Sequence, residues 1–208
     1  MGLVACRVKQ ICIPAHSYIA TLNSCIRAFC DISWADVTDT GCIDWNTNTE
    51  QDTVWVGLFG NPSTIPQNVR VYEDGAQHFG LPLQGLFAAY SFDPTKTLPN
   101  FGNGGAVVTN DEDIIYAVRM LRRHNWVDMH VGGNSVMSER DCAELLVKLE
   151  YFNAWTKRRQ ELAEFYTQEL QDYVRIITDP KGMVSKFVIA SNCRAGLRTS
   201  ISKKGIQS

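Results

Sequence analysis

The chain has 208 residues, of which 45% are hydrophobic and 20% are charged, and its formal net charge is −2. This composition is typical of an ordinary globular protein with enough apolar residues for one sizeable core, or for one domain and part of another. The near-neutral charge gives no general electrostatic reason to expect nucleic acid or an anionic membrane as a partner. It favours a small polar or phosphorylated ligand.

No window holds the eighteen apolar residues that a membrane-spanning helix needs, and the N-terminal MGLVACRVKQ is too short and too quickly charged for a secretory signal. We therefore expect a cytoplasmic protein. The seven cysteines contain no CxxC pair and have no histidine partner at ligand spacing. This pattern disfavours a zinc site and a disulfide framework, so we expect reduced thiols and no metal.

Short apolar runs bounded by turn residues recur through the first half of the chain. Several are apolar on both faces, which is typical of strands covered on two sides in a largely parallel sheet. The runs are QICIP (10–14), ISWADV (32–37), TVWVGLF (53–59), VRVY (69–72), LFAAYSF (86–92) and GAVVTN (105–110). They predict an α/β layer fold.

Two shorter helices are predicted, one between the first two runs and one after the last run. The first, over residues 17–29, would be a crossover helix whose apolar face is formed by Ile19, Leu22, Ile26 and Phe29. The second begins at Asn110 or Asp111, either of which can cap a helix. Its apolar face is formed by Ile114, Ile115, Val118 and Leu121.

From Ser138 the pattern predicts one long helix, with Cys142, Leu145, Leu149, Phe152 and Trp155 at steps of three or four. A helix of roughly thirty residues spans about 45 Å, which is longer than one small domain is wide. We therefore predict a large domain over 1–137, then the connecting helix and an incomplete small domain over 138–208. After the helix come a possible strand, 186–190, and a helical segment, 194–205.

Acidic residues follow one of the predicted strands. In VRVYEDGAQHFG (69–80), Glu73 and Asp74 come at the end of an apolar run. Open α/β sheets bind their ligands at the carboxyl ends of strands, so at least one of these carboxylates is a candidate site residue. Such acids also commonly cap a following helix or face water, which is the alternative.

A lysine follows the next buried run through a proline turn, in SFDPTK (91–96). Most lysines lie on solvated faces, and that reading of Lys96 is the simpler one. If both strands lie in one sheet, however, Asp74, Ser91 and Lys96 converge at one edge. A lysine amine beside a carboxylate and a hydroxyl in a partly desolvated cleft is suited to forming a Schiff base with an aldehyde.

Four motifs occur in a fixed order: YEDGAQ (72–77), SFDPTK (91–96), GNGGAVVTND (102–111) and GGNSVMSERDCAELLVKL (132–149). Together with the upstream IPAHSYIATLNSCIRAF (13–29), they resemble the nucleotide-sugar aminotransferases of the DegT/StrS type. These enzymes use pyridoxal 5'-phosphate on the type I aspartate-aminotransferase fold. The resemblance implies a three-layer sandwich with a largely parallel sheet, followed by the start of a smaller C-terminal α/β domain.

The resemblance also implies a role for individual residues. Lys96 would form the Schiff base with the cofactor and later move a proton between substrate and cofactor carbons, while Asp74 would keep the pyridine nitrogen protonated. The remaining contacts would be Gln77 near the phenolic oxygen, Ser91 at the phosphate, Tyr18 on the ring face and Asn134 at the phosphate of the neighbouring subunit's cofactor. The last contact implies a homodimer with shared active sites. Without the resemblance, Tyr18 would be read as a core aromatic at a helix start.

The implied reaction moves an amino group from glutamate to a keto carbon of a nucleotide-linked sugar, for cell-surface polysaccharide or amino-sugar biosynthesis. A relative that removes a sugar hydroxyl carries histidine at the lysine position, so Lys96 favours amine transfer. The alternative is a non-catalytic α/β scaffold that binds pyridoxal phosphate or a partner chain without turnover.

The sequence departs from the family pattern at both ends and in the interior. Compared with the family, the chain lacks segments at both ends, which implies a piece truncated at each terminus. The connection NPSTIPQN (61–68) leaves almost no helix between two strands, and HFGLPLQGLFAAYSF (78–92) is also shorter than the family's usual connection. Val136 stands where an arginine is common.

Overall fold

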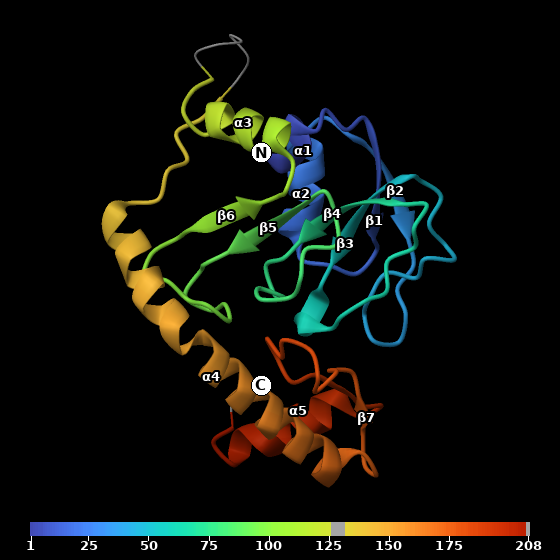
Figure 1. The fold of residues 1–208 in the computed structure, drawn as a ribbon. Helices are drawn as coiled ribbons and strands as arrows, with labels where there is room; N and C mark the ends of the chain where they lie inside the picture. The colour runs from blue at the N-terminus through green and yellow to red at the C-terminus, as the bar shows by residue number, and fades with distance from the viewer. Residues whose placement is uncertain (126–131, 207–208) are drawn as a thin grey trace.

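The computed structural model describes residues 1–125 and 132–206, and its centre is a six-stranded sheet with the order β2-β1-β3-β4-β5-β6 (Figure 1). The strands are β1 (Gln10–Pro14), β2 (Asp31–Ala35), β3 (Asp52–Val56), β4 (Arg70–Asp74), β5 (Phe87–Ser91) and β6 (Gly105–Val108). The first five are parallel, and β6 alone runs antiparallel to its neighbour β5. The predicted α/β fold with a largely parallel sheet is confirmed.

The sheet is buried on both faces, which explains why its strands are apolar without alternation. In β1, Ile11 and Ile13 pack in one hydrophobic cluster with Leu3 and Phe87, on one face. Cys12, between them, packs in a second cluster with Trp55 on the opposite face. Because successive side chains of a strand point to opposite faces, both faces of β1 need apolar residues.

Helices α1 (Gly2–Ala5), α2 (Ile19–Arg27) and α3 (Glu112–Leu121) belong to this part of the chain, and α1 packs beside α3. At the start of α3, the Asp111 carboxylate accepts hydrogen bonds from the backbone N–H groups of Asp113 (2.9 Å) and Ile114 (3.2 Å). Asp111 is one of the two predicted caps. Ile114 and Leu121, on the predicted apolar face, are buried.

The apolar face predicted for α2 is confirmed only at Leu22, which packs against the first hydrophobic cluster, and is wrong for the other three residues. Ile19 and Ile26 are 57% and 55% exposed, and Phe29, beyond the helix end, is 90% exposed. The residues that α2 buries are Thr21 and Cys25. Polar and small side chains therefore face the sheet beside Leu22, because the Thr21 hydroxyl donates a hydrogen bond to Asp74 on the sheet.

Helix α4 (Glu139–Leu170) is 32 residues long and begins where the Ser138 hydroxyl accepts a hydrogen bond from the N–H of Asp141 (3.1 Å). It runs from beside the sheet to the C-terminal part of the chain (Figure 1). Leu145 and Phe152 face inward as predicted, into a third hydrophobic cluster. The other predicted inward positions, Cys142, Leu149 and Trp155, are exposed or only partly covered.

Beyond α4, a small antiparallel ladder joins β7 (Arg175–Ile176) to β8 (Ile189–Ala190), and α5 (Arg194–Lys203) follows. Of the strand predicted over 186–190, only the last two residues enter a ladder. The predicted helix over 194–205 is confirmed. The domain boundary placed near residue 137 stays a prediction.

All seven cysteines are free thiols in the structure. Among residues 1–125 and 132–206, no helix combines the length and apolar character that crossing a membrane requires.

Candidate functional site

Polar groups gather at the carboxyl ends of β4 and β5. Strand β4 ends at Asp74 and β5 at Ser91. The two strands are parallel with Asp74 opposite Ala89, so Ser91 lies two residues further along the same edge. The structure therefore brings these two predicted site residues to one rim of the sheet, the rim at which α/β proteins bind ligands.

The Asp74 carboxylate is held in place by helix α2. Its Oδ2 accepts a hydrogen bond of 2.7 Å from the hydroxyl of Thr21, and its Oδ1 accepts one of 3.2 Å from the N–H of Ala76. Thr21 is buried. Sequence reasoning missed Thr21, because α2 carries two hydroxyls, at Thr21 and Ser24, and no local pattern distinguishes the one that faces the sheet.

Tyr18 lies one helical turn before Thr21. Its backbone carbonyl accepts a hydrogen bond of 3.0 Å from the N–H of Thr21. Its side chain is 68% exposed, so Tyr18 is not a core aromatic at the start of α2. The N-cap position of α2 thus supplies an exposed aromatic ring three residues before Thr21, which holds Asp74.

Gln77 is half-buried and has its amide oxygen occupied. Oε1 accepts hydrogen bonds from the backbone N–H of Phe59 (2.7 Å) and from the hydroxyl of Ser185 (3.3 Å). An amide carries its oxygen and its NH2 group on opposite sides, so these two donors fix which way the group faces. The Nε2 donors of Gln77 are the part left for a ligand.

Lys96 is half-buried and sits at the end of a tight turn. The Asp93 carboxylate accepts hydrogen bonds from the N–H (2.9 Å) and hydroxyl (2.6 Å) of Thr95, which lower the pKa of Asp93. The N–H of Lys96 donates to the carbonyl of Asp93 (2.9 Å). Ser91 Oγ accepts from the N–H of Asp93 at 3.4 Å, so the Ser91 hydroxyl keeps its own proton to donate.

The lysine loop, residues 92–104, is closed at its base. The N–H of Phe92 donates to the carbonyl of Gly104 (2.9 Å), and the N–H of Asn100 donates to the carbonyl of Phe92 (2.8 Å). Leu98 is buried in the third hydrophobic cluster with Leu145 of α4. The loop that presents Lys96 is therefore a fixed part of the fold.

Helix α4 also contacts the lysine loop through two cations. Lys148 Nζ donates to the carbonyl of Pro99 at 2.9 Å, and Arg159 Nη2 lies 3.4 Å from the carbonyl of Thr97. Desolvation lowers the pKa of Arg159. These contacts connect the residue after Lys96 directly to α4.

Glu73 and Asp74, the two acids at the end of β4, have different surroundings. Glu73 is fully buried, and its Oε1 accepts from the N–H groups of Gln84 and Gly85, both at 2.6 Å. Its Oε2 lies 3.2 Å from Nε2 of His78, within ion-pair range but not aligned for a hydrogen bond.

Burial acts to raise the pKa of Glu73, but the His78 side chain and the two backbone N–H donors outweigh it and hold this pKa below its usual range. The His78 ring stacks on Trp55 with the ring centroids 4.6 Å apart. Glu73 is therefore a structural acid inside the fold, and Asp74 is the acid available at the rim.

Asn134 lies apart from the other candidate residues in the fold. It is exposed and forms an isolated antiparallel bridge with Arg123, just beyond the end of α3. Its predicted contact is with a cofactor of a neighbouring subunit, and that contact stays a prediction.

The site as a whole offers four kinds of group along one sheet edge: a carboxylate at Asp74, amide N–H donors at Gln77, a hydroxyl at Ser91 and a primary amine at Lys96. Such a set can hold a heterocycle that carries a basic nitrogen, an acceptor oxygen, an anionic tail and an electrophilic carbon.

Comparison with known proteins gives a consistent result. The model of the DegT/DnrJ/EryC1/StrS aminotransferase family matches residues 1–207. One curated relative, the dTDP-3-amino-3,4,6-trideoxy-alpha-D-glucose transaminase of Streptomyces venezuelae, is 27% identical in an alignment that covers 95% of this chain and 60% of the relative. The chain thus spans less than two thirds of that relative's length.

Two solved structures share the fold. A DegT DnrJ EryC1 StrS aminotransferase from Brucella abortus superposes with a TM-score of 0.89 at 22% identity, covering 99% of this chain and 66% of the other. NtdA from Bacillus subtilis, whose crystal structure contains the bound cofactor PMP, gives a TM-score of 0.85 at 24% identity, covering 99% of this chain and 56% of the other.

Proposed function

Because the chain belongs to the DegT/DnrJ/EryC1/StrS aminotransferase family, we propose that it binds pyridoxal 5'-phosphate at the carboxyl edge of β4 and β5 and transfers an amino group in the cytoplasm. The donor would be glutamate and the acceptor a keto carbon of a nucleotide-linked sugar. The observation that carries the proposal is the parallel register that sets Asp74 and Ser91 on one rim, with the lysine loop leaving from Ser91.

The groups present fit this cofactor. Asp74 provides a fixed carboxylate for the pyridine nitrogen, and its hydrogen bond from Thr21 keeps that carboxylate in one orientation. Gln77 has its amide oxygen occupied and so offers N–H donors, which match the phenolic oxygen. Ser91 retains an O–H donor for the phosphate. Tyr18, exposed at the start of α2, offers an aromatic face for the ring.

When bound, pyridoxal phosphate supplies the electron sink that stabilises negative charge on the substrate carbon. Asp74 would hold the pyridine nitrogen in its protonated form. Lys96 Nζ would hold the cofactor and, as a free amine, would carry the proton of the substrate carbon. The closed base of loop 92–104 holds that amine at the rim between these steps.

Absorbance spectroscopy on the 208-residue chain tests the proposal. Mixed with pyridoxal phosphate, the wild-type protein is expected to develop a visible band, which Lys96→Ala abolishes and Lys157→Ala, an exposed position on α4, leaves intact. Borohydride reduction followed by peptide mass spectrometry is expected to place the added mass on Lys96. Absence of a band in the wild type would refute cofactor binding.

Glutamate then separates the enzyme from a non-catalytic scaffold. Added to the loaded protein, glutamate is expected to remove the visible band as the amino group moves to the cofactor. A band that forms on Lys96 but does not respond to glutamate would favour the scaffold.

Homodimerisation is part of the proposal, since Asn134 would serve the neighbouring subunit's site. We expect a dimer in sedimentation velocity at micromolar concentration. A strictly monomeric profile would contradict the shared site without affecting cofactor binding by Lys96.

A further inference from the structure

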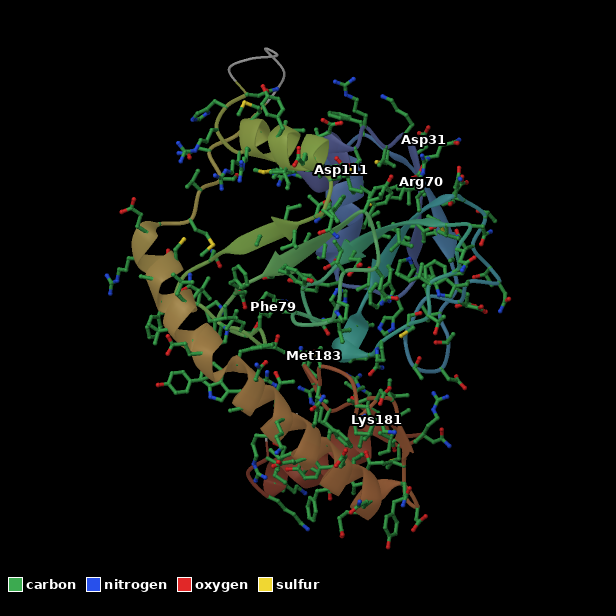
Figure 2. The ribbon with its side chains drawn as sticks, viewed as in Figure 1. Asp31, Arg70, Phe79, Asp111, Lys181 and Met183 are labelled. Atoms are coloured by element: carbon green, nitrogen blue, oxygen red, sulfur yellow. The ribbon has the colours of Figure 1, made fainter. Side chains whose placement is uncertain are left out.

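Residues 177–185, named here the C-terminal strap, follow β7 (Arg175–Ile176) and reach η1 (Leu58–Gly60), beyond the carboxyl end of β3. In Figure 2, Met183 on this strap lies between Lys181 and Phe79. Met183 is buried in the third hydrophobic cluster, against which Phe79 packs. The strap is therefore a packed part of the site's surroundings, although more than a hundred residues separate it from β4 in the sequence.

Backbone hydrogen bonds attach the strap to η1 (Leu58–Gly60), which follows β3. The N–H of Met183 donates to the carbonyl of Gly60 (2.9 Å), and the N–H of Ser185 donates to the carbonyl of Phe59 (3.0 Å). A Cβ on Gly60 would come within 2.8 Å of the backbone nitrogen of Val184. The two segments approach so closely that only glycine fits at this point.

A buried asparagine anchors the other end of the strap. Asn61 is 2% exposed, and its Nδ2 donates to the carbonyl of Ile177 (3.0 Å) while its Oδ1 accepts from the N–H of Asp179 (2.8 Å). On the α4 side, Gln160 Nε2 donates to the carbonyl of Gly182 (2.9 Å). The position of Ser185 is thus set from both sides of the strap.

Two residues of this contact have an unusual backbone. Val184 has φ of 43° and Phe59 has φ of 63°. Positive φ is disfavoured for any residue with a side chain and most of all for a β-branched one, and such strain persists where the surrounding structure enforces it. These two strained residues place the two groups that donate to Gln77. The first donor is the backbone N–H of Phe59 itself, and the second is the hydroxyl of Ser185, the residue after Val184.

We propose that Ser185 is a positioning residue for Gln77. Together with the N–H of Phe59, its hydroxyl occupies the amide oxygen of Gln77 and so directs the Nε2 donors toward the ligand edge. Gln77 then presents only N–H groups to the ligand and so selects a ligand atom that accepts a hydrogen bond. With the amide turned around, its oxygen would face that acceptor and repel it. Naming that acceptor as the phenolic oxygen of pyridoxal phosphate rests on the proposed function.

The orientation is tested first without cofactor, by hydrogen exchange at the Phe59 amide. In Ser185→Ala, the freed Gln77 side chain is expected to protect that amide less, with exchange about fivefold to tenfold faster, as for the loss of one hydrogen bond. Ser185→Thr, which keeps the hydroxyl, is expected to restore protection. Ser200→Ala, at an exposed position of α5, is the control and is expected to have no effect.

The consequence for the ligand is tested by a pH titration of the visible band after loading with pyridoxal phosphate. The quantity compared between variants is the pH at the midpoint of the absorbance change. Gln77→Glu keeps an acceptor for Phe59 but removes both N–H donors, so it is expected to shift the midpoint while leaving Phe59 protected. Ser185→Ala is expected to shift the midpoint in the same direction by a smaller amount, and Ser185→Thr to return it.

Unchanged exchange at Phe59 in Ser185→Ala would overturn the positioning role, as would a midpoint that moves in Gln77→Glu but not in Ser185→Ala. A wild-type protein without a visible band would defeat the proposed function, and the exchange result would then decide the positioning role by itself.

Discussion

The hydroxyl of Thr21 donates a hydrogen bond of 2.7 Å to Oδ2 of Asp74 across 53 residues of sequence. This contact explains why α2 buries Thr21 and Cys25 and leaves its isoleucines exposed. A carboxylate at the end of a buried strand needs a donor, and the helix that crosses beside it is turned so that it supplies one.

Thr21→Val keeps the shape of the side chain and removes this donor. Because a partly buried hydrogen bond to a carboxylate is lost, we expect the free energy of unfolding to fall by about 1.5 to 3 kcal/mol. We also expect weaker binding of pyridoxal phosphate, measured by titrating the visible band. Ser24→Ala, on the exposed face of the same helix, should change neither quantity. Unaltered stability in Thr21→Val would show that Asp74 does not depend on this bond.

Glu73→Gln tests the buried acid. The pKa of Glu73 is lower in the folded protein than in the unfolded chain, so its contribution to stability is full above the ordinary carboxyl value of about 4.3 and is lost as the pH falls through the folded value. The wild type should therefore lose stability in acid more steeply than Glu73→Gln, as measured by urea unfolding between about pH 3 and pH 6. Parallel curves for the two proteins would exclude Glu73 as the group responsible.

Gly57→Ala should disturb the ring that packs behind the site. A Cβ at Gly57 would overlap Nδ1 of His78, which is fully buried against Trp55 and has no room to move. We expect a loss of about 1 to 3 kcal/mol in thermal unfolding, as is usual for overpacking. Gly133→Ala is the matched control because its Cβ would meet nothing closer than 3.9 Å. Equal melting temperatures for the two variants would contradict the predicted overlap.

Asn61→Ala should release the C-terminal strap. The substitution leaves the carbonyls of Thr40 and Ile177 and the N–H of Asp179 without their partner, at a cost of about 1 to 3 kcal/mol for each group that water cannot reach. We expect faster hydrogen exchange at Asp179 and earlier proteolysis within the strap. Asn68→Ala, at an exposed loop position, should leave both unchanged. A strap that stays protected in Asn61→Ala would mean that other contacts are sufficient to hold it.

Local patterns in the sequence predicted the elements that depend on local physics. The cap at Asp111, the inward face of α3 and the length of α4 follow from short-range rules of helix formation, and the structure confirms them. The motif order likewise identified the family. The placement of Asp74 at a strand end followed from an apolar run that stops at an acid.

Contacts between distant segments could not be predicted in this way. The Thr21–Asp74 and Ser185–Gln77 hydrogen bonds join residues 53 and 108 positions apart. No helical or strand periodicity relates residues so far apart, so their spacing in the sequence does not predict contact. The predicted buried face of α2 was wrong at Ile19 and Ile26 for the same reason, since hydrophobicity alone favoured them together with Leu22, which does pack on the core. A polar partner on the sheet outweighed that preference.

The two pairings of β5 bear on the order of folding. The pairing with β6 joins residues 14 to 20 positions apart, from Ser91–Gly105 to Ala88–Val108, and the parallel pairing with β4 joins residues 15 positions apart, such as Asp74 and Ala89. Contacts of short sequence separation cost less chain entropy to close, so both pairings can form early. The segments that carry Asp74 and Lys96 would then take up their shape together, as one local nucleus.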